Sequence, residues 1–197
     1  MAESAESLNI NFYKPEKRFI IPIYTFHIPR KLLSEYKKKK YKFSIDNDFE
    51  NVINNCSLPR KNEDGTWINK LIKKNYIKLN KEGYAHSIEC FEKNRLVAGL
   101  YGIHIGSCFF GESMFTKKTN GSKLALIYLI TLLINNKFTL LDSQFFNSHL
   151  LQFGAYEISD HIYQDILKHG LKINKKFPKK LDTQKSISIL QSLSHKS

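Results

Sequence analysis

The sequence has few of the residues that mark a disulfide-bonded or membrane-spanning protein. Cysteine occurs three times in 197 residues, at Cys56, Cys90 and Cys108, an odd number without the spacing of a metal site. This usage argues against a disulfide scaffold and favours a reducing compartment, the cytoplasm. The longest largely apolar run, Leu124 to Ile134, is shorter than the roughly 20 residues of a membrane helix, so we expect a buried core helix there.

Acidic residues and arginine are also scarce. The chain has 18 acidic against 31 basic residues, a formal net charge of +13, and only four of the basic residues are Arg. A surplus of this size favours a polyanionic partner, nucleic acid first and an anionic membrane second. Abundant Lys beside abundant Asn is also what codon bias in an AT-rich genome produces, so charge alone leaves both explanations open.

Hydrophobic residues are plentiful enough for a folded chain with a sizeable core. They make up 42% of the sequence and include 14 Phe and 10 Tyr. The acidic, polar residues 1–4 do not resemble a signal peptide. We expect a flexible lead and small N-terminal remnant over residues 1–60, a main domain over 61–175, and a basic tail over 176–197 that is loose at its end.

The hydrophobic pattern predicts an α+β fold with a mixed, largely antiparallel sheet and flanking helices. A helix is expected from Thr66, ending near Gly83, which suits a C-terminal cap. This order resembles the acyltransferase fold of the N-acetyltransferase (GNAT) superfamily. The later elements expected are strands at 85–91, 96–105 and 108–115, a helix at 123–135, a short buried strand at 138–143, and helices at 147–153 and 159–169.

A polar pair stands at the end of the predicted strand 138–143. Residues two apart on a strand face the same side, so we expect Asp142 and Gln144 to point together and Ser143 to point away. A carboxylate beside an amide can hold and deprotonate an amine, although such a pair also caps loops. Glu112 follows an apolar run, so it is either paired, functional or facing water.

Five short blocks, read together, resemble the leucyl/phenylalanyl-tRNA–protein transferase family. Each block is weak alone, but they occur in the order and at the spacing of that family, from about residue 12 to about residue 175. The blocks are Gly65-Thr66-Trp67-Ile68, Gly83-Tyr84-Ala85-His86-Ser87-Ile88-Glu89, Gly99-Leu100-Tyr101-Gly102, Phe110-Gly111-Glu112-Ser113-Met114-Phe115 with Ser122-Lys123, and Leu141-Asp142-Ser143-Gln144 with Asn147, His149-Leu150 and Gly154-Ala155.

The resemblance implies peptide-bond synthesis without a ribosome. The donor would be an aminoacyl-tRNA carrying Leu or Phe, with Met as a further candidate. The acceptor would be the α-amine of a protein that begins with Lys or Arg, and the product would be marked for degradation. Because the ester is already activated, the resemblance implies no ATP, metal, acetyl-CoA or other cofactor. We expect a cytoplasmic monomer that does not bind membranes.

The same resemblance assigns roles to residues. Asp142 would polarise Gln144, which would draw a proton from the amine, while Glu112 and Asn147 would hold the amine or brace that pair. From pattern alone, the apolar and aromatic candidates are equally well explained as core. The expected pocket for the donor side chain is Leu100, Phe109, Met114, Leu133 and Leu141; the expected adenosine pair is Trp67 and Tyr76; the expected tRNA phosphate contacts are Lys37, Lys38, Lys39 and Lys40.

One departure and three alternatives accompany the resemblance. Typical members carry a module with a Gly-Ile-Phe-Pro-Trp type block ahead of the region matching residue 12, so the resemblance predicts a short form here. The alternatives are an arginyl-type transferase acting on acidic N-termini, a CoA-dependent N-acyltransferase, and a non-catalytic tRNA-binding relative. The CoA-dependent enzyme needs a backbone cradle for pyrophosphate before the 123–135 helix, where residues 117–121 supply one glycine.

Overall fold

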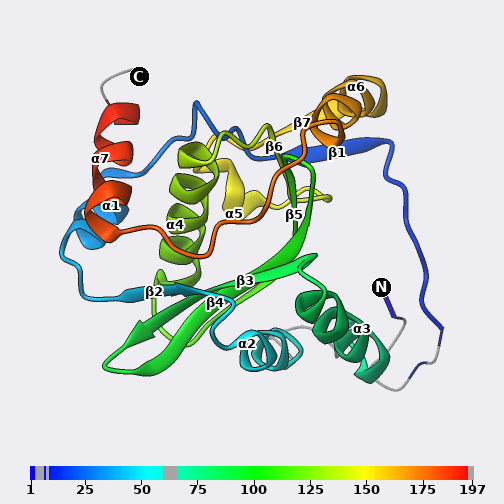
Figure 1. Cartoon of the computed structure of the whole chain (residues 1–197), viewed down its shortest axis with the longest axis horizontal. Coiled ribbons are helices and arrows are strands. Elements are labelled where there is room, and N and C mark those ends of the chain that lie inside the picture. The colour runs from blue at the N-terminus through cyan, green and yellow to red at the C-terminus, as the bar shows by residue number, and fades with distance from the viewer. Residues whose placement is uncertain (3–6, 8, 60–65, 195–197) are drawn as a thin grey trace.

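A seven-stranded sheet separates two layers of helices in a computed structural model that describes residues 1–2, 7, 9–59 and 66–194 (Figure 1). The strand order is β2-β3-β4-β5-β6-β1-β7, and every pairing is antiparallel except that of β5 with β6. The strands are β1 (Lys17–Ile20), β2 (Lys42–Ile45), β3 (Ala85–Glu92), β4 (Arg95–Ile105), β5 (Cys108–Thr116), β6 (Leu140–Asp142) and β7 (Tyr156–Ser159).

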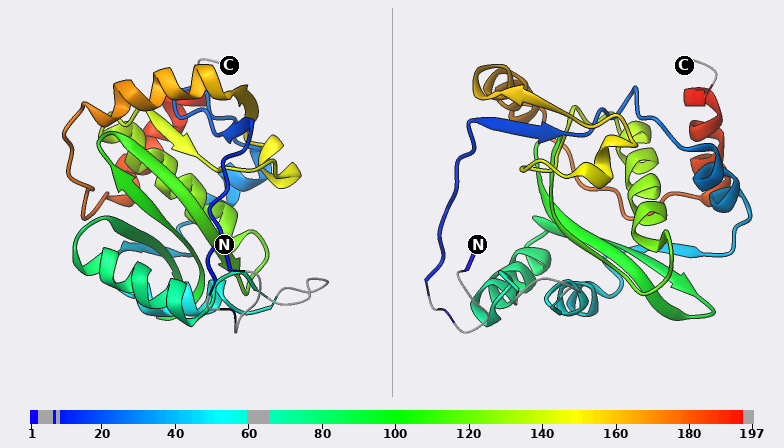
Figure 2. Two further views of the ribbon diagram at one scale, coloured as in Figure 1. Left: turned by 90° about the vertical axis from the view of Figure 1, so that its right-hand side faces the viewer. Right: turned by 180° about the vertical axis from the view of Figure 1, so that it is seen from behind.

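The helices cover both faces of this sheet. Ala98 on β4 lies against Gly121 of α4, whereas its neighbour Gly99 lies against Val52 of α2, so α2 and α4 pack on opposite faces. Figure 2 shows α3 on the same side as α2, and α1 and α7 together beside α4. The helices are α1 (Arg30–Lys37), α2 (Phe49–Cys56), α3 (Lys70–Lys81), α4 (Gly121–Asn135), α5 (Ser148–Leu151), α6 (Asp160–Leu171) and α7 (Thr183–Ser194).

The three strands predicted between residues 85 and 115, which form an antiparallel meander, and the predicted core helix are confirmed, and with them the α+β fold class. The strands β3, β4 and β5 pair in sequence as antiparallel neighbours. Every residue of α4 from Leu124 to Leu133 is buried, which is typical of a helix that is apolar on all sides. This helix carries the chain across the sheet to β6, which pairs parallel with β5, so the sheet is mixed as predicted.

The N-terminal segment is more fully built into the sheet than its composition suggested. Strand β1 lies between β6 and β7, and β2 forms an edge strand beside β3. The pattern of the sequence did not indicate β7, whose four residues alternate poorly, with only Ile158 buried. The first 60 residues therefore supply two strands and two helices of the same structure.

One expectation about a helix boundary is wrong. The helix expected from Thr66 begins at Lys70, because the side chain of Asn69 caps it by accepting a hydrogen bond from the amide of Ile72 at 2.7 Å. Trp67 therefore precedes the helix, and Gly65 lies outside the described residues. The basic tail expected over 176–197 includes α7, which buries Leu190 against the core, and its last three residues, 195–197, lie outside the described residues.

No helix in the described part of the chain combines the length and the apolar character that crossing a bilayer requires.

Candidate active site

Two adjoining pockets open where β5 and β6 diverge. The two strands pair only as far as Phe110 and Asp142, and the residues beyond this pair separate. We call the cavity of about 220 Å³ beside α4 and α5 the inner pocket, and the cavity of about 580 Å³ beside α3 the outer pocket. They share the walls Trp67, Gly111, Glu112, Ser143 and Phe145.

Apolar side chains make up most of the lining of the inner pocket. Four of the five residues expected to hold the donor side chain line it; the prediction for Leu133 is wrong, because its side chain packs in the hydrophobic core outside the pocket lining. From α4, Leu126 and Leu129 line it instead. A helix that is apolar on every side gave no sequence signal for the turn that faces the pocket. The apolar lining consists mainly of Leu100, Phe109, Met114, Leu126, Leu129, Leu141, Phe146 and Leu150.

The sizes of the two pockets suit different ligands. Pockets for drug-sized molecules measure roughly 300–1,000 Å³. The inner pocket, at about 220 Å³, lies below this range and suits a single amino-acid side chain, whereas the outer pocket, at about 580 Å³, lies within it. The outer pocket is bounded by α3 and by residues 10–13, with Trp67 and Tyr76 in its wall.

Asp142 is held by three hydrogen bonds in a fully buried position. Nη2 of Arg18 donates to its Oδ2 at 2.6 Å, and the hydroxyl of Tyr163 donates to the same oxygen at 2.8 Å. Arg18 also lies over the ring of Tyr163, 4.5 Å from the centroid. The third bond, from the amide of Gln144 to Oδ1, is 2.7 Å long. Both carboxylate oxygens are therefore occupied by groups of the protein itself.

Strand β1 fixes the segment that follows Asp142. The amide of Ser143 donates to the carbonyl of Phe19 at 2.9 Å, and the amide of Phe19 donates to the carbonyl of Gln144 at 3.2 Å. The hydroxyl of Ser143 also donates to Phe19, at 2.7 Å, so it turns away from Asp142 as expected. Backbone and side chain together bind this segment to β1.

The expectation that Asp142 and Gln144 share one strand face is wrong. Strand β6 ends at Asp142, and Gln144 has a φ of 70°, in the left-handed region. This turn directs the amide group of Gln144 across to β5, where its Nε2 donates to the carbonyl of Gly111 and to Oε1 of Glu112, both at 3.2 Å. Asp142 thus contacts the backbone of Gln144, and Glu112 contacts its side chain.

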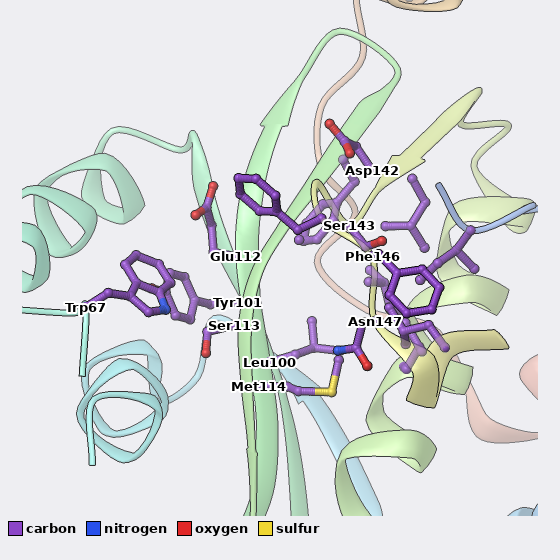
Figure 3. Close-up of a pocket in the computed structure, with 18 residues that line it drawn as sticks. Trp67, Leu100, Tyr101, Glu112, Ser113, Met114, Asp142, Ser143, Phe146 and Asn147 are labelled. Carbon is purple, nitrogen blue, oxygen red and sulfur yellow. The ribbon is translucent and has the colours of Figure 1, made fainter. Parts of the chain in front are cut away.

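Glu112 owes its position to a β-bulge. On β4, Tyr101 pairs with Ser113 and Gly102 pairs with Gly111, which leaves Glu112 as the extra residue of β5. Bulges of this kind re-aim a side chain and are frequent beside active sites. Figure 3 shows Glu112 on the side of β5 that carries Trp67, whereas Met114 lies on the side of α5. The bulge thus places a carboxylate in the wall of both pockets.

Burial raises the pKa of the Glu112 carboxyl above its ordinary value of 4.5. Hydrogen bonds from Tyr76 and Gln144 oppose this rise, and the charge of Asp142 adds to it. The same environment raises the pKa of Tyr76, so its hydroxyl stays protonated and able to donate. A carboxylate with a raised pKa is suited to accept a proton near neutral pH.

The remaining predicted site residues are less closely grouped. Tyr76 packs edge-on against Tyr101, with ring centroids 5.2 Å apart. Asn147 lines the inner pocket, but its side-chain oxygen caps α5 by accepting from the amide of His149 at 3.0 Å. Trp67 borders both pockets, and Figure 3 shows its ring on the side of Glu112.

The run Lys37 to Lys40 lies away from both pockets, at the end of α1. Two of its amines have partners: that of Lys39 donates to Gln184 at 2.9 Å, and that of Lys40 lies 2.7 Å from Glu92. In Figure 1, α1 lies beside α7, on the other side of α4 from α3. The run therefore lies on a different face from the outer pocket.

The fold and the site together are typical of an acyltransferase. An apolar pocket for one side chain, next to a larger pocket and a carboxylate–amide pair, suits the transfer of an acyl group to an amine. The comparison with known families then identifies the class closely. The chain belongs to the leucyl/phenylalanyl-tRNA protein transferase family, a family of transferases, whose model matches residues 20–168.

Individual relatives agree with this assignment. The chain is 42% identical over 177 residues to the leucyl/phenylalanyl-tRNA–protein transferase of Hyphomonas neptunium, covering 90% of this chain and 69% of that protein. It is 41% identical over 171 residues to the enzyme of the same name from Phenylobacterium zucineum, covering 87% and 77%. Among solved structures, L-PGS from Bacillus licheniformis is 14% identical, with a TM-score of 0.47, covering 90% of this chain and 64% of that one.

Proposed function

We propose that this chain transfers Leu or Phe from an aminoacyl-tRNA to the α-amine of a protein that begins with Lys or Arg. The observation that carries the proposal is the Glu112–Gln144 pair, in which Glu112 lines both pockets and Gln144 lines the outer one. The names of the relatives support the donor and the type of reaction. The product would enter a degradation pathway that reads N-terminal residues.

The donor would occupy both pockets at once. Its apolar side chain fits the inner pocket, which suits one side chain and discriminates only weakly between Leu, Met and Phe. Its terminal adenosine fits the outer pocket, where Trp67 and Tyr76 offer aromatic surfaces for the base. The ester carbonyl that joins the two parts would then lie at the junction, beside Glu112.

The reaction needs a neutral amine and a place for its proton. An α-amine has a reference pKa of roughly 7.7–8.0, so it arrives largely protonated at neutral pH. Glu112 accepts one proton from it, and Gln144 accepts a hydrogen bond through Oε1, since its Nε2 already donates to Glu112 and Gly111. The amine nitrogen then bonds to the ester carbon, the ester C–O bond breaks, and the 3′ oxygen of the tRNA takes up the second proton that the nitrogen gives up.

Asp142 would act through Gln144 instead of touching the amine. Both of its oxygens are occupied, by Arg18, by Tyr163 and by the amide of Gln144. Its role is to hold Gln144 in a left-handed conformation that a residue other than glycine adopts reluctantly. Holding the amine and the ester in a fixed geometry supplies several kcal/mol of the rate enhancement in reactions of this kind.

The partners and the state of the enzyme form part of the same proposal. The exposed lysines of the run 37–40 add to the attraction for tRNA, and Asn147 braces the acceptor from the inner pocket. We propose that the chain acts as a monomer. The cytoplasm, where aminoacyl-tRNA is made, is the compartment in which we place it.

A transfer assay tests the proposal. Leucyl-, phenylalanyl- and arginyl-tRNA are each incubated with peptides that begin with Arg, Lys, Asp or Glu. We expect transfer of Leu and Phe to the Arg and Lys peptides, with large losses in Glu112→Gln and Gln144→Ala. Transfer of arginine to the acidic peptides would replace the proposal by an arginyl-type enzyme. Full transfer by both variants with intact tRNA binding would remove the assigned site.

A further inference from the structure

The solvent-facing side of α3 carries a row of lysines that the proposed chemistry does not use. Lys70, Lys74, Lys78 and Lys81 recur at steps of four, four and three, which places them on one face of the helix. Lys73 lies beside them, and the five lysines border a shallow groove with Asn54 and Ile77. We call these five residues the lysine face. Lys73 is half-buried and the other four are exposed.

The charge of the lysine face is largely uncompensated. Its only ion pair within the described part of the chain joins Lys78 to Glu82, one turn away at 3.7 Å, and such an exposed pair contributes little. Lys14, which directly follows the outer-pocket residues 10–13, is neutralised more closely, because its amine lies 2.9 Å from Asp160. A row of like charges on one helix repels itself, which makes it a receptive surface for a polyanion.

The lysine face and the outer pocket share one helix. The opposite flank of α3 forms the wall of the outer pocket through Ile72, Asn75, Tyr76 and Leu79. Lys78 lies one turn after the wall residue Asn75, a spacing that makes the two neighbours on the helix surface, and Lys74 lies one turn before Lys78. A chain of nucleotides that leaves the outer pocket across the rim formed by α3 therefore meets these two lysines first.

We propose that the lysine face binds the phosphate backbone of the tRNA acceptor end while the terminal adenosine lies in the outer pocket. This inference rests on the proposed function and adds a surface for the donor. Lysine amines are point charges that contact phosphates without reading bases, so the lysine face binds any tRNA and leaves selection of the amino acid to the inner pocket. The proposed partner of the lysine face is therefore RNA and not an acidic protein.

The salt dependence of tRNA binding tests the lysine face directly. The affinity of uncharged tRNA is measured by fluorescence anisotropy across a series of salt concentrations for the parent chain and for Lys74→Gln/Lys78→Gln. Each lost phosphate contact reduces the slope of log affinity against log salt by roughly 0.7–0.9, so we expect the double variant to be shallower by roughly 1.4–1.8. The matched control is Lys168→Gln/Lys185→Gln, two exposed lysines on α6 and α7 with the same change in charge.

The outcomes separate this inference from the proposed function. The slope is measured without any reaction, so it can be read even if the chain transfers nothing. An unchanged slope, or an equal change in the control, would overturn the inference, because it would show that the lysine face does not contact the tRNA phosphates. Where transfer occurs, the ratio of kcat/KM for phenylalanyl-tRNA to that for phenylalanyl-adenosine should fall in Lys74→Gln/Lys78→Gln and hold in the control. Absence of transfer from both donors by the parent chain would count against the proposed function alone.

Discussion

Arg18 and Asp142, 124 positions apart in the sequence, form an ion pair of 2.6 Å that joins β1 to the end of β6. The side chain of Asp142 is fully buried, and that of Arg18 is 17% exposed. Tyr163 from α6 completes the group by accepting from Arg18 at 3.0 Å and donating to Asp142. Three distant segments thus meet at the carboxylate that holds Gln144.

Loss of the guanidinium should damage both folding and transfer. In Arg18→Met the carboxylate of Asp142 stays buried without its cation, which costs roughly 3–5 kcal/mol when one partner of a buried pair is removed. We expect the free energy of unfolding, measured by urea denaturation, to fall by about this amount, and transfer to fall with it. Arg95→Met, at an exposed position, is the matched control and should change the stability little. Equal stability of the two variants would refute the role of the pair.

Removal of the Tyr163 hydroxyl is a milder test than Arg18→Met of whether Asp142 positions Gln144. Tyr163→Phe keeps the ring under Arg18 but deletes one donor to Asp142, a change that costs about 1–3 kcal/mol when a buried polar group loses its partner. Because Tyr163 lines neither pocket, we expect kcat to fall while KM for aminoacyl-tRNA holds. Steady-state kinetics of this variant and of the exposed Tyr156→Phe give the comparison. A rise in KM alone would mean that Tyr163 acts on donor binding.

The sequence predicted the centre of the fold better than its edges. The meander and α4 have local signals, namely turn residues between strands and one long apolar helix. Strand β1 has four residues, and its partners β6 and β7 lie more than a hundred positions away, so no local pattern reveals the pairing. Helix α7 has no clear signal in the sequence because the tail from residue 172 on is rich in Lys and Ser, although Ile187 and Leu190 are spaced to face α4.

In the candidate site, too, the identities of the residues could be predicted, whereas their arrangement could not. The resemblance named Asp142, Gln144 and Glu112, but it could not show how they connect. The positive φ of Gln144 and the bulge at Glu112 are tertiary features that reverse the simple alternation of a strand. Arg18 was missed because nothing in the sequence links it to Asp142; its one available signal was that Arg is scarce in this chain.

The pH dependence of transfer should report the ionisation of Glu112. Burial raises the pKa of this carboxyl above 4.5, and only its ionised form accepts the proton of the amine. At saturating donor and acceptor, kcat should therefore rise with pH through a value above 4.5. Glu112→Gln should lack this rise and lose about 10²–10⁴ in rate, the usual contribution of a general base. An unchanged acid limb in that variant would assign the ionisation to another group.

The inner pocket should set the preference for the donor. Leu129→Phe adds volume to a wall of this pocket, so we expect transfer of Phe to fall more than transfer of Leu. Leu133→Phe, one turn further along α4 and outside the pocket lining, is the matched control. Both changes overpack the core at a cost of about 1–3 kcal/mol, so the measured quantity is the ratio of kcat/KM for the two donors. An equal shift of this ratio in both variants would argue against the inner pocket as the side-chain site.

A buried carboxylate away from both pockets, that of Glu89, should make the stability of the fold depend on pH. Glu89 is fully buried and accepts hydrogen bonds from Ser44 and Ser87, and burial raises its pKa above 4.5. The folded state then holds more protons than the unfolded state from pH 4.5 up to the raised pKa, so stability falls as pH rises through this window. Glu89→Gln lacks this contribution, and its stability relative to the parent should increase with pH in urea denaturation. A difference that stays constant with pH would contradict the prediction.

Mass spectrometry of a single acceptor peptide tests the central claim most directly. A peptide that begins with Lys is incubated with leucyl-tRNA and the chain, beside the same peptide with an acetylated α-amine. The Glu112–Gln144 site predicts one leucyl residue added at the α-amine of the free peptide and none on the acetylated one, with the addition lost in Glu112→Gln. Addition to the acetylated peptide, to the lysine side chain, or undiminished addition by Glu112→Gln would contradict it.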